Sequence, residues 1–199
     1  MMTLFQLLML GASAFFAYKV YEHIQTLKDS DRQESGSSPE AKKSAEAFSP
    51  FNPQALIIKA DEEFEAGNLQ KAFALLKEAN AKEAQNSDVL FKMGYILQQL
   101  GDNEEALKYY KEALELDKEN EFIHNSIASV YRAKGEFVSA RMHLSASLAL
   151  DDKNPITYYN YGNLLVDMKH IEEAKEMYKN ALALKEDFKE AQEELEKLG

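Results

Sequence analysis

Residues 94–106 read GYILQQLGDNEEA, and three other stretches of the chain repeat the spacing of their small residues. These are residues 60–72 (ADEEFEAGNLQKA), 128–140 (ASVYRAKGEFVSA) and 162–174 (GNLLVDMKHIEEA). Each stretch opens on glycine or alanine and closes on alanine. The closing residues, Ala72, Ala106, Ala140 and Ala174, are 34 positions apart each time. A fixed period of this length predicts an array of like supersecondary units.

The repeated positions resemble those of the tetratricopeptide repeat, a helical hairpin in which each of these positions has a physical reason. A small opening residue lets a second helix approach the first closely, and a glycine seven positions later supplies a left-handed turn between them. The glycine is present as Gly67, Gly101 and Gly135, but the fourth copy has Lys169. If the backbone keeps a positive φ there, we expect a cost of about 1 kcal/mol. A bulky residue follows each closing alanine by four positions and is expected to insert between repeats: Leu76, Tyr110, Leu144 and Tyr178.

This register resembles the tetratricopeptide repeat family from about residue 53 to residue 188. The resemblance implies an all-α solenoid of four helix-turn-helix repeats, at about 53–86, 87–120, 121–154 and 155–188, and a capping helix at 189–199. The tryptophan of the family is absent, and its places hold Leu56, Leu90, His124 and Tyr158. The proline that ends the family's repeat is missing as well.

The N-terminal segment predicts a membrane anchor. Met1 to Tyr18 contains no charged side chain, and we expect residues 1–22 to form a transmembrane helix that meets the membrane through residues 3–21. Residues 23–52 are expected to be a flexible polar linker. Lys19, Lys28 and Arg32 follow the apolar run and none precedes it, so the repeats should face the cytoplasm from the inner (cytoplasmic) membrane. A cleaved signal peptide and a periplasmic location remain alternatives.

The resemblance also implies a peptide-binding groove lined by the first helix of each repeat. Six residues are the candidates for contacting a bound segment: Phe91, Tyr95, Phe122, Asn125, Tyr159 and Asn163. The aromatic rings would take apolar side chains, and the amides would pair with the backbone of the partner. The alternative is that several of these rings pack against neighbouring helices.

Some relatives clamp the C-terminal carboxylate of heat-shock chaperones with lysine, asparagine and arginine. The corresponding places here hold Ile57, Asp61, Lys92, Phe122 and Ser126 in the first three repeats, and Phe91, Tyr95, Ser126, Ile156 and Asn160 in the last three. Neither set makes a cationic pocket, so we do not expect this ligand.

Composition argues against several other classes of function. The chain has no cysteine and a net charge of −11, which excludes thiolate chemistry and disfavours nucleic acid as a partner. No two of its four histidines have metal-ligand spacing, and no phosphate-binding loop or catalytic motif is present. We therefore expect neither an enzyme nor a cofactor-binding protein.

The sequence thus predicts a membrane-tethered scaffold for protein–protein interaction, or an assembly chaperone, that serves a bacterial membrane complex. Its partners would be proteins, such as components of a secretion, motility or respiratory assembly. One alternative is a periplasm-facing accessory for envelope or cytochrome c maturation. The other is a structural membrane protein that associates with itself through the groove or the anchor.

Overall fold

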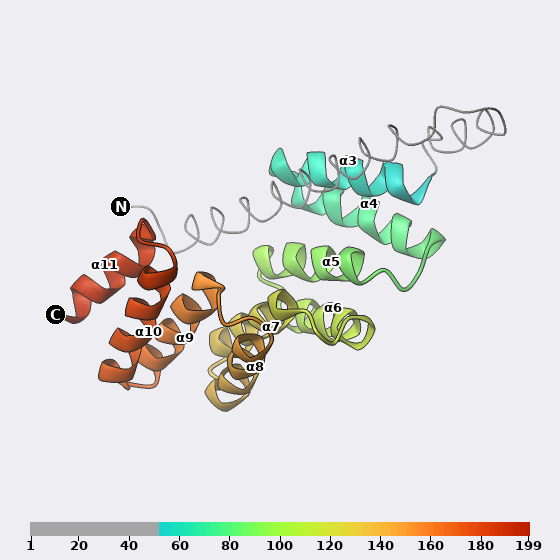
Figure 1. Ribbon diagram of the computed structural model, residues 1–199. Helices are drawn as coiled ribbons and strands as arrows, with labels where there is room; N and C mark the ends of the chain where they lie inside the picture. Colours follow the sequence, from blue (N-terminus) through green and yellow to red (C-terminus); the bar gives the residue numbers. More distant parts are fainter. Residues whose placement is uncertain (1–51) are drawn as a thin grey trace, which may run out of the picture. The chain divides into compact units, whose positions relative to one another are not determined.

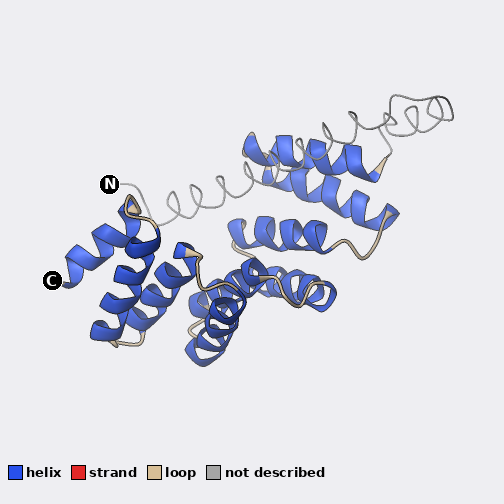
Figure 2. Ribbon diagram, in the orientation of Figure 1, coloured by secondary structure: helices blue, strands red, loops and turns tan. Residues whose placement is uncertain are grey.

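The computed structural model describes residues 52–199, which contain nine α-helices and no strand (Figures 1 and 2). The helices are α3 (Pro53–Glu65), α4 (Leu69–Lys82), α5 (Ser87–Gln99), α6 (Asn103–Leu116), α7 (Glu121–Ala133), α8 (Phe137–Leu150), α9 (Pro155–Asp167), α10 (Ile171–Leu184) and α11 (Lys189–Leu198). The predicted all-α solenoid is confirmed over these residues.

Helices pair within each repeat and contact the next repeat in chain order. We call α3, α5, α7 and α9 the A helices, and α4, α6, α8 and α10 the B helices. The A helices of neighbouring repeats also touch directly, α5 with α7 and α7 with α9. We call the surface that the A helices share the A-helix face. On α11, Leu195 and Leu198 pack against the last hairpin, as the sequence predicted for a cap.

The predicted anchor at 1–22 and nearly all of the linker at 23–52 lie outside the described residues. From residue 52 onward, no helix is both long and apolar enough to span a bilayer.

An asparagine caps the N-terminus of every A helix and recurs with the same period as the alanines. Asn52, Asn86, Asn120 and Asn154 each accept a backbone N–H of the first helical turn through the side-chain oxygen, at 2.9 to 3.2 Å. Each cap satisfies an amide that has no partner within the helix. The spacing of 34 residues therefore fixes where every repeat starts as well as how it packs.

The turns between A and B helices share one conformation. Gly67, Gly101 and Gly135 have φ between 76° and 86°, and Lys169 adopts the same region with a φ of 66°. The N–H of the following residue bonds to the carbonyl five positions back, as in His170 N–H to Leu165 O at 2.8 Å. This pattern ends the helix with its carbonyls satisfied. The fourth repeat therefore keeps the turn despite its lysine.

In each repeat a matched pair of residues packs where the A helix contacts the B helix. Ala72, Ala106, Ala140 and Ala174 are fully buried at equivalent places in the B helices. At the facing positions the size of one residue follows the size of the other. Glycine faces tyrosine in repeats two and four (Gly94 with Tyr110, Gly162 with Tyr178), and the smaller leucine occurs with alanine in repeats one and three (Ala60 with Leu76, Ala128 with Leu144).

A methyl group at Gly94 would lie 2.8 Å from the ring of Tyr110, and one at Gly162 would lie 2.5 Å from the ring of Tyr178. Real Cβ atoms do not make such contacts, so alanine at either position forces the ring or the helix to move. The tyrosine rings thus lie directly over the glycine backbone. The two kinds of repeat are alternative solutions to the same packing problem.

Repeat three contains a partly buried contact between two histidines that the sequence spacing did not indicate. The Nδ1 atoms of His124 on α7 and His143 on α8 lie 3.0 Å apart, so one ring donates and the other accepts. The His143 ring also stacks on Tyr131, and the ammonium of Lys111 on α6 lies over that tyrosine. Burial is the main reason that the pKa of His143 falls to about 4, with help from His124 and Lys111. Burial lowers the pKa of His124 as well.

We predict that Gly94→Ala destabilises the protein by about 1–3 kcal/mol, because overpacking exceeds the helix-propensity gain of about 1 kcal/mol. In the Tyr110→Leu background the same change should be stabilising, because the pair then has the Ala–Leu composition of repeats one and three. Urea unfolding of the four proteins in a double-mutant cycle measures this reversal of sign. Additive effects of the two substitutions would show that the facing sizes are not coupled.

The histidine pair predicts a loss of stability in mild acid. Both folded-state pKa values lie below the ordinary value, so the unfolded chain binds more protons and stability falls as the pH drops from about 6.5 to about 4. His143→Met, which copies Met177 at the same place in repeat four, should reduce the difference between urea midpoints at about pH 7.5 and pH 5. Met177→Leu, at the same place in repeat four, removes no titratable group, so it is the control and should leave that difference unchanged. An unaltered difference in the Met variant would contradict the assignment.

Candidate functional site

Polar side chains tie each A helix to the next across the A-helix face. Lys92 on α5 bonds to both carboxylate oxygens of Asp61 on α3, each at 2.7 Å. The Gln98 amide on α5 donates to Ser129 on α7 at 3.1 Å. The Arg132 Nε on α7 lies 2.6 Å from the Asp167 carboxylate on α9. Every junction between repeats is therefore bridged on this face.

These bridges neutralise two cations that the register places on the A-helix face. The Lys92 and Asp61 side chains are only 16% and 14% exposed, so water screens their attraction weakly. Arg132 and Asp167 are about one-third exposed. An incoming carboxylate would have to displace a carboxylate that the fold already holds in place. The net charge of the A-helix face is consequently close to zero around Lys92 and around Arg132.

The structure places Asn125 inside the solenoid rather than on an open groove surface. It is 7% exposed, and its amide nitrogen donates to the Thr157 hydroxyl on α9, with the Ser147 hydroxyl on α8 at 3.5 Å. Its oxygen accepts the Asn160 amide at 2.9 Å. Ser147 in turn donates to the backbone oxygen of Glu121 at 3.0 Å. Asn125 therefore joins α7, α8 and α9. The sequence predicted that its amide would contact a bound segment, whereas in the structure the amide bonds to side chains inside the solenoid.

Asn163 is half-buried and already has a partner within its own repeat. The Tyr178 hydroxyl on α10 donates to its oxygen at 2.8 Å. In repeat two the Tyr110 hydroxyl makes the same kind of bond to the Gln98 oxygen at 2.8 Å. Burial raises the pKa of Tyr110 and of Tyr178, so both hydroxyls stay protonated as donors. The tyrosines that cross the glycines thus orient amides on the A-helix face.

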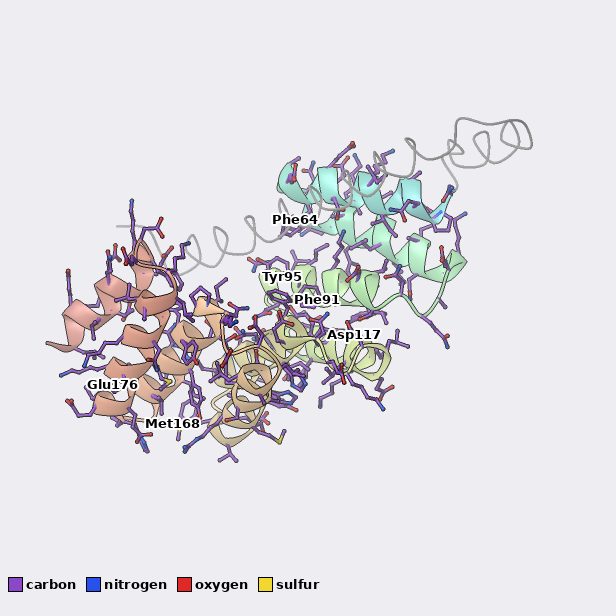
Figure 3. All side chains as sticks on the ribbon, viewed as in Figure 1. Phe64, Phe91, Tyr95, Asp117, Met168 and Glu176 are labelled. Carbon is purple, nitrogen blue, oxygen red and sulfur yellow. The ribbon has the colours of Figure 1, made fainter. Side chains whose placement is uncertain are left out.

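Three of the predicted aromatic residues pack against rings of neighbouring helices. Tyr95 on α5 and Phe64 on α3, both labelled in Figure 3, have ring centroids 5.7 Å apart. The ring of Phe91 lies 5.6 Å from that of Tyr110 on α6. Tyr159 lies between Tyr178 at 5.9 Å and Phe188 at 5.2 Å. Burial raises the pKa of Tyr95 to about 12 and also raises that of Tyr159. Each of the three keeps part of its surface exposed, so it combines packing with access from solvent.

Phe122 and Ile156 occupy one and the same position in repeats three and four, in the first turn of the A helix. The asparagine caps fix this turn, because Asn120 accepts from the Phe122 N–H and Asn154 accepts from the Ile156 N–H. Phe122 is half-buried and Ile156 is 39% exposed. The caps therefore present an apolar side chain at the start of each of these A helices. Sequence reasoning found the side chains but missed the period of the caps.

A small hollow lies between α7, α8 and α9. It is lined by Ala128, Ser129, Arg132, Leu144 and Asn160, with a volume of about 10 Å³. A space of this size holds about one water molecule. A ligand on this part of the face would have to lie across the surface rather than insert a side chain.

Two segments of the chain match models of the tetratricopeptide repeat, at residues 87–120 and at residues 156–188. The chain is similar to the type IV pilus assembly protein PilF of Pseudomonas aeruginosa, at 32% identity over 92 residues. The match covers 46% of this chain and 36% of PilF, so the chain spans about a third of that relative's length.

Solved structures show the same fold. TTC0263, a thermophilic protein of the same repeat class from Thermus thermophilus, matches with a TM-score of 0.68 and 22% identity, over 78% of this chain and 86% of that one. The first repeat domain of Spaghetti (RPAP3), solved with the HSP90 peptide SRMEEVD, matches with a TM-score of 0.55 and 27% identity, over 58% and 92% of the two chains. Residues 87–120 and 156–188 are therefore tetratricopeptide repeats, and the other helix pairs of the described chain extend the same solenoid.

Proposed function

We propose that the protein is a membrane-tethered assembly scaffold whose A-helix face binds an uncharged, apolar segment of a partner protein. The general role as a scaffold follows from the fold, since tetratricopeptide solenoids are scaffolds for protein–protein interaction. The proposal adds the face, the chemistry of the bound segment and the tether.

The internal neutralisation of the A-helix face carries the argument. Lys92 and Arg132 are each paired with a carboxylate of the neighbouring A helix. Replacing an intramolecular carboxylate by one from solution gains little, because the internal one is present at a high effective concentration. Apolar surface of Phe122 and Ile156, by contrast, gains free energy when a partner removes it from water. The face therefore favours apolar side chains over acidic ones.

The comparison with Spaghetti sharpens this difference. That protein was solved with the peptide SRMEEVD, which contains three acidic residues. In the present chain the corresponding clamp positions hold Lys92 already bound to Asp61, and Phe122, Ile156 and Tyr95 supply apolar surface. We infer that a shared fold serves a different ligand chemistry here.

The tether and the assembly role rest on the sequence and on the relative. The uncharged run from Met1 to Tyr18 has the length and composition of an anchor, and Lys19, Lys28 and Arg32 after it favour a cytoplasmic orientation. A tethered scaffold meets partners of the same membrane at raised effective concentration, so a shallow face suffices. PilF is a type IV pilus assembly protein, and the similarity to it favours an assembly factor of a membrane complex. A reporter fused after Gly199 tests the orientation, because phosphatase activity there would place the repeats outside the cytoplasm.

Site-specific photo-crosslinking in cells tests the A-helix face. We predict that a photoreactive side chain at position 122 or 156 forms adducts with a partner, because both positions lie on the proposed face. Leu184 on α10 is the matched control, because it is 43% exposed and Ile156 is 39% exposed, yet it lies on a B helix. Ile156→Asp should reduce adducts from position 122 about ten-fold, since a carboxylate would have to be buried without a partner, whereas Leu184→Asp should not.

Salt separates an apolar contact from an electrostatic one. Raising ionic strength from about 0.05 M to about 0.5 M should change the yield at position 122 by less than about two-fold. A steep loss with salt would mean that charge, such as a basic partner attracted by the acidic chain, governs binding. Equal adducts at positions 122 and 184 would mean that the A-helix face is not the binding surface.

A further inference from the structure

The outer face of α8 lacks the charges that the other B helices carry. Within the described chain, α4, α6 and α10 contain at least four charged residues each, whereas α8 reads FVSARMHLSASLAL. It has no aspartate, glutamate or lysine, and its single permanent charge is Arg141. The Arg141 Nε lies 3.1 Å from the Tyr161 hydroxyl on α9, so the guanidinium has a partner within the solenoid.

Exposed apolar surface takes the place of those charges. Val138 is 83% exposed and Met142 is 62% exposed, more than any other exposed large hydrophobic residue of residues 52–199. Ser145 and Ala149 continue the same helix face and are also exposed. The four residues recur at intervals of four, three and four positions, so they share one face. We call Val138, Met142, Ser145 and Ala149 the α8 stripe.

The negative charge of the chain limits where a second copy can bind, and the α8 stripe meets that limit. With a net charge of −11, two copies repel each other over much of their surface. The α8 stripe is a place where they can approach without bringing carboxylates of these helices together. A partner of opposite charge would gain nothing from a stripe that has no acid.

The order of side chains along the stripe is self-complementary. Its two large residues lie in the first half and its two small residues in the second. In an antiparallel pair of helices related by a two-fold axis, a residue on one side of the axis faces the residue of the other copy that lies equally far on the opposite side in the sequence. A single centre, between His143 and Leu144, places Val138 opposite Ala149 and Met142 opposite Ser145. Large then meets small at both levels, which allows two helices to pack about 8–10 Å apart.

We propose that the protein forms an antiparallel two-fold dimer through the α8 stripe. One helix from each copy supplies far fewer than the about 20–30 residues per side of a standard interface, so the dimer is weak and forms where copies are concentrated. Because α8 is a B helix, the dimer leaves the A-helix faces of both copies open. The inference is thus independent of the proposed ligand and adds that the scaffold presents two such faces.

The absence of cysteine in the full-length chain allows a direct test by disulfide formation. Met142→Cys and Ser145→Cys chains with different tags are mixed and oxidised, and likewise Val138→Cys with Ala149→Cys. We expect both mixed pairs to crosslink about ten-fold more than Glu176→Cys with Lys179→Cys, the equivalent exposed positions on α10. Two Val138→Cys chains should not crosslink with each other, because the antiparallel register places them about 16 Å apart along the helices.

Met142→Asp tests whether apolar contact drives the association. It should lower the Val138–Ala149 crosslink about ten-fold and leave the far-ultraviolet circular dichroism unchanged, because residue 142 is largely exposed in the single chain. Equal crosslinking of the α8 and α10 pairs would show random collision and overturn the proposal. Strong crosslinking between two Val138→Cys chains would overturn the antiparallel register. Crosslinks from these positions to a different protein, with none between copies, would assign the stripe to that partner instead.

Discussion

The close approach of the two helices in each repeat is the constraint on which the rest of the structure depends. It requires a glycine or alanine on the A helix, a buried alanine on the B helix and a side chain of matched size above them. Where glycine removes the last methyl group, a whole tyrosine ring fits, and its hydroxyl reaches an amide on the A-helix face. The packing rule inside a repeat thereby decides which polar groups are held at its surface.

On the A-helix face, the groups that could attract charged ligands instead join neighbouring repeats. Asp61 with Lys92, and Arg132 with Asp167, act across the junctions. What the face retains is apolar surface that the asparagine caps orient, at Phe122 and Ile156. In such a solenoid the polar groups join the repeats, and the apolar side chains remain available for a partner. The uncharged, apolar segment that we propose as the ligand matches those side chains.

The sequence predicted the architecture because period and residue size are local properties of the chain. The alanine spacing, the left-handed turn and even the strained Lys169 could be read directly. The fate of Asn125 could not, because its partners Ser147 and Thr157 lie 22 and 32 residues away and become neighbours only in the folded array. The contact of His124 with His143 escaped for the same reason. The asparagine caps were visible at the same period of 34, and a search beyond small and bulky residues would have found them.

The bridges between repeats are unevenly distributed, and this affects how the array opens. Repeats two and three share the Gln98–Ser129 hydrogen bond and repeats one and two share the Asp61–Lys92 pair, whereas repeats three and four share the buried Asn125 network and a second ion pair. In a linear array, stability is the sum of repeat and junction energies, so opening begins where the junctions are weak. The first two repeats should therefore separate from the array before the last two, which unfold as one cooperative block. A pulling force applied on the N-terminal side of the solenoid would then open the first two repeats, and the half that contains Phe122 and Ile156 would stay intact.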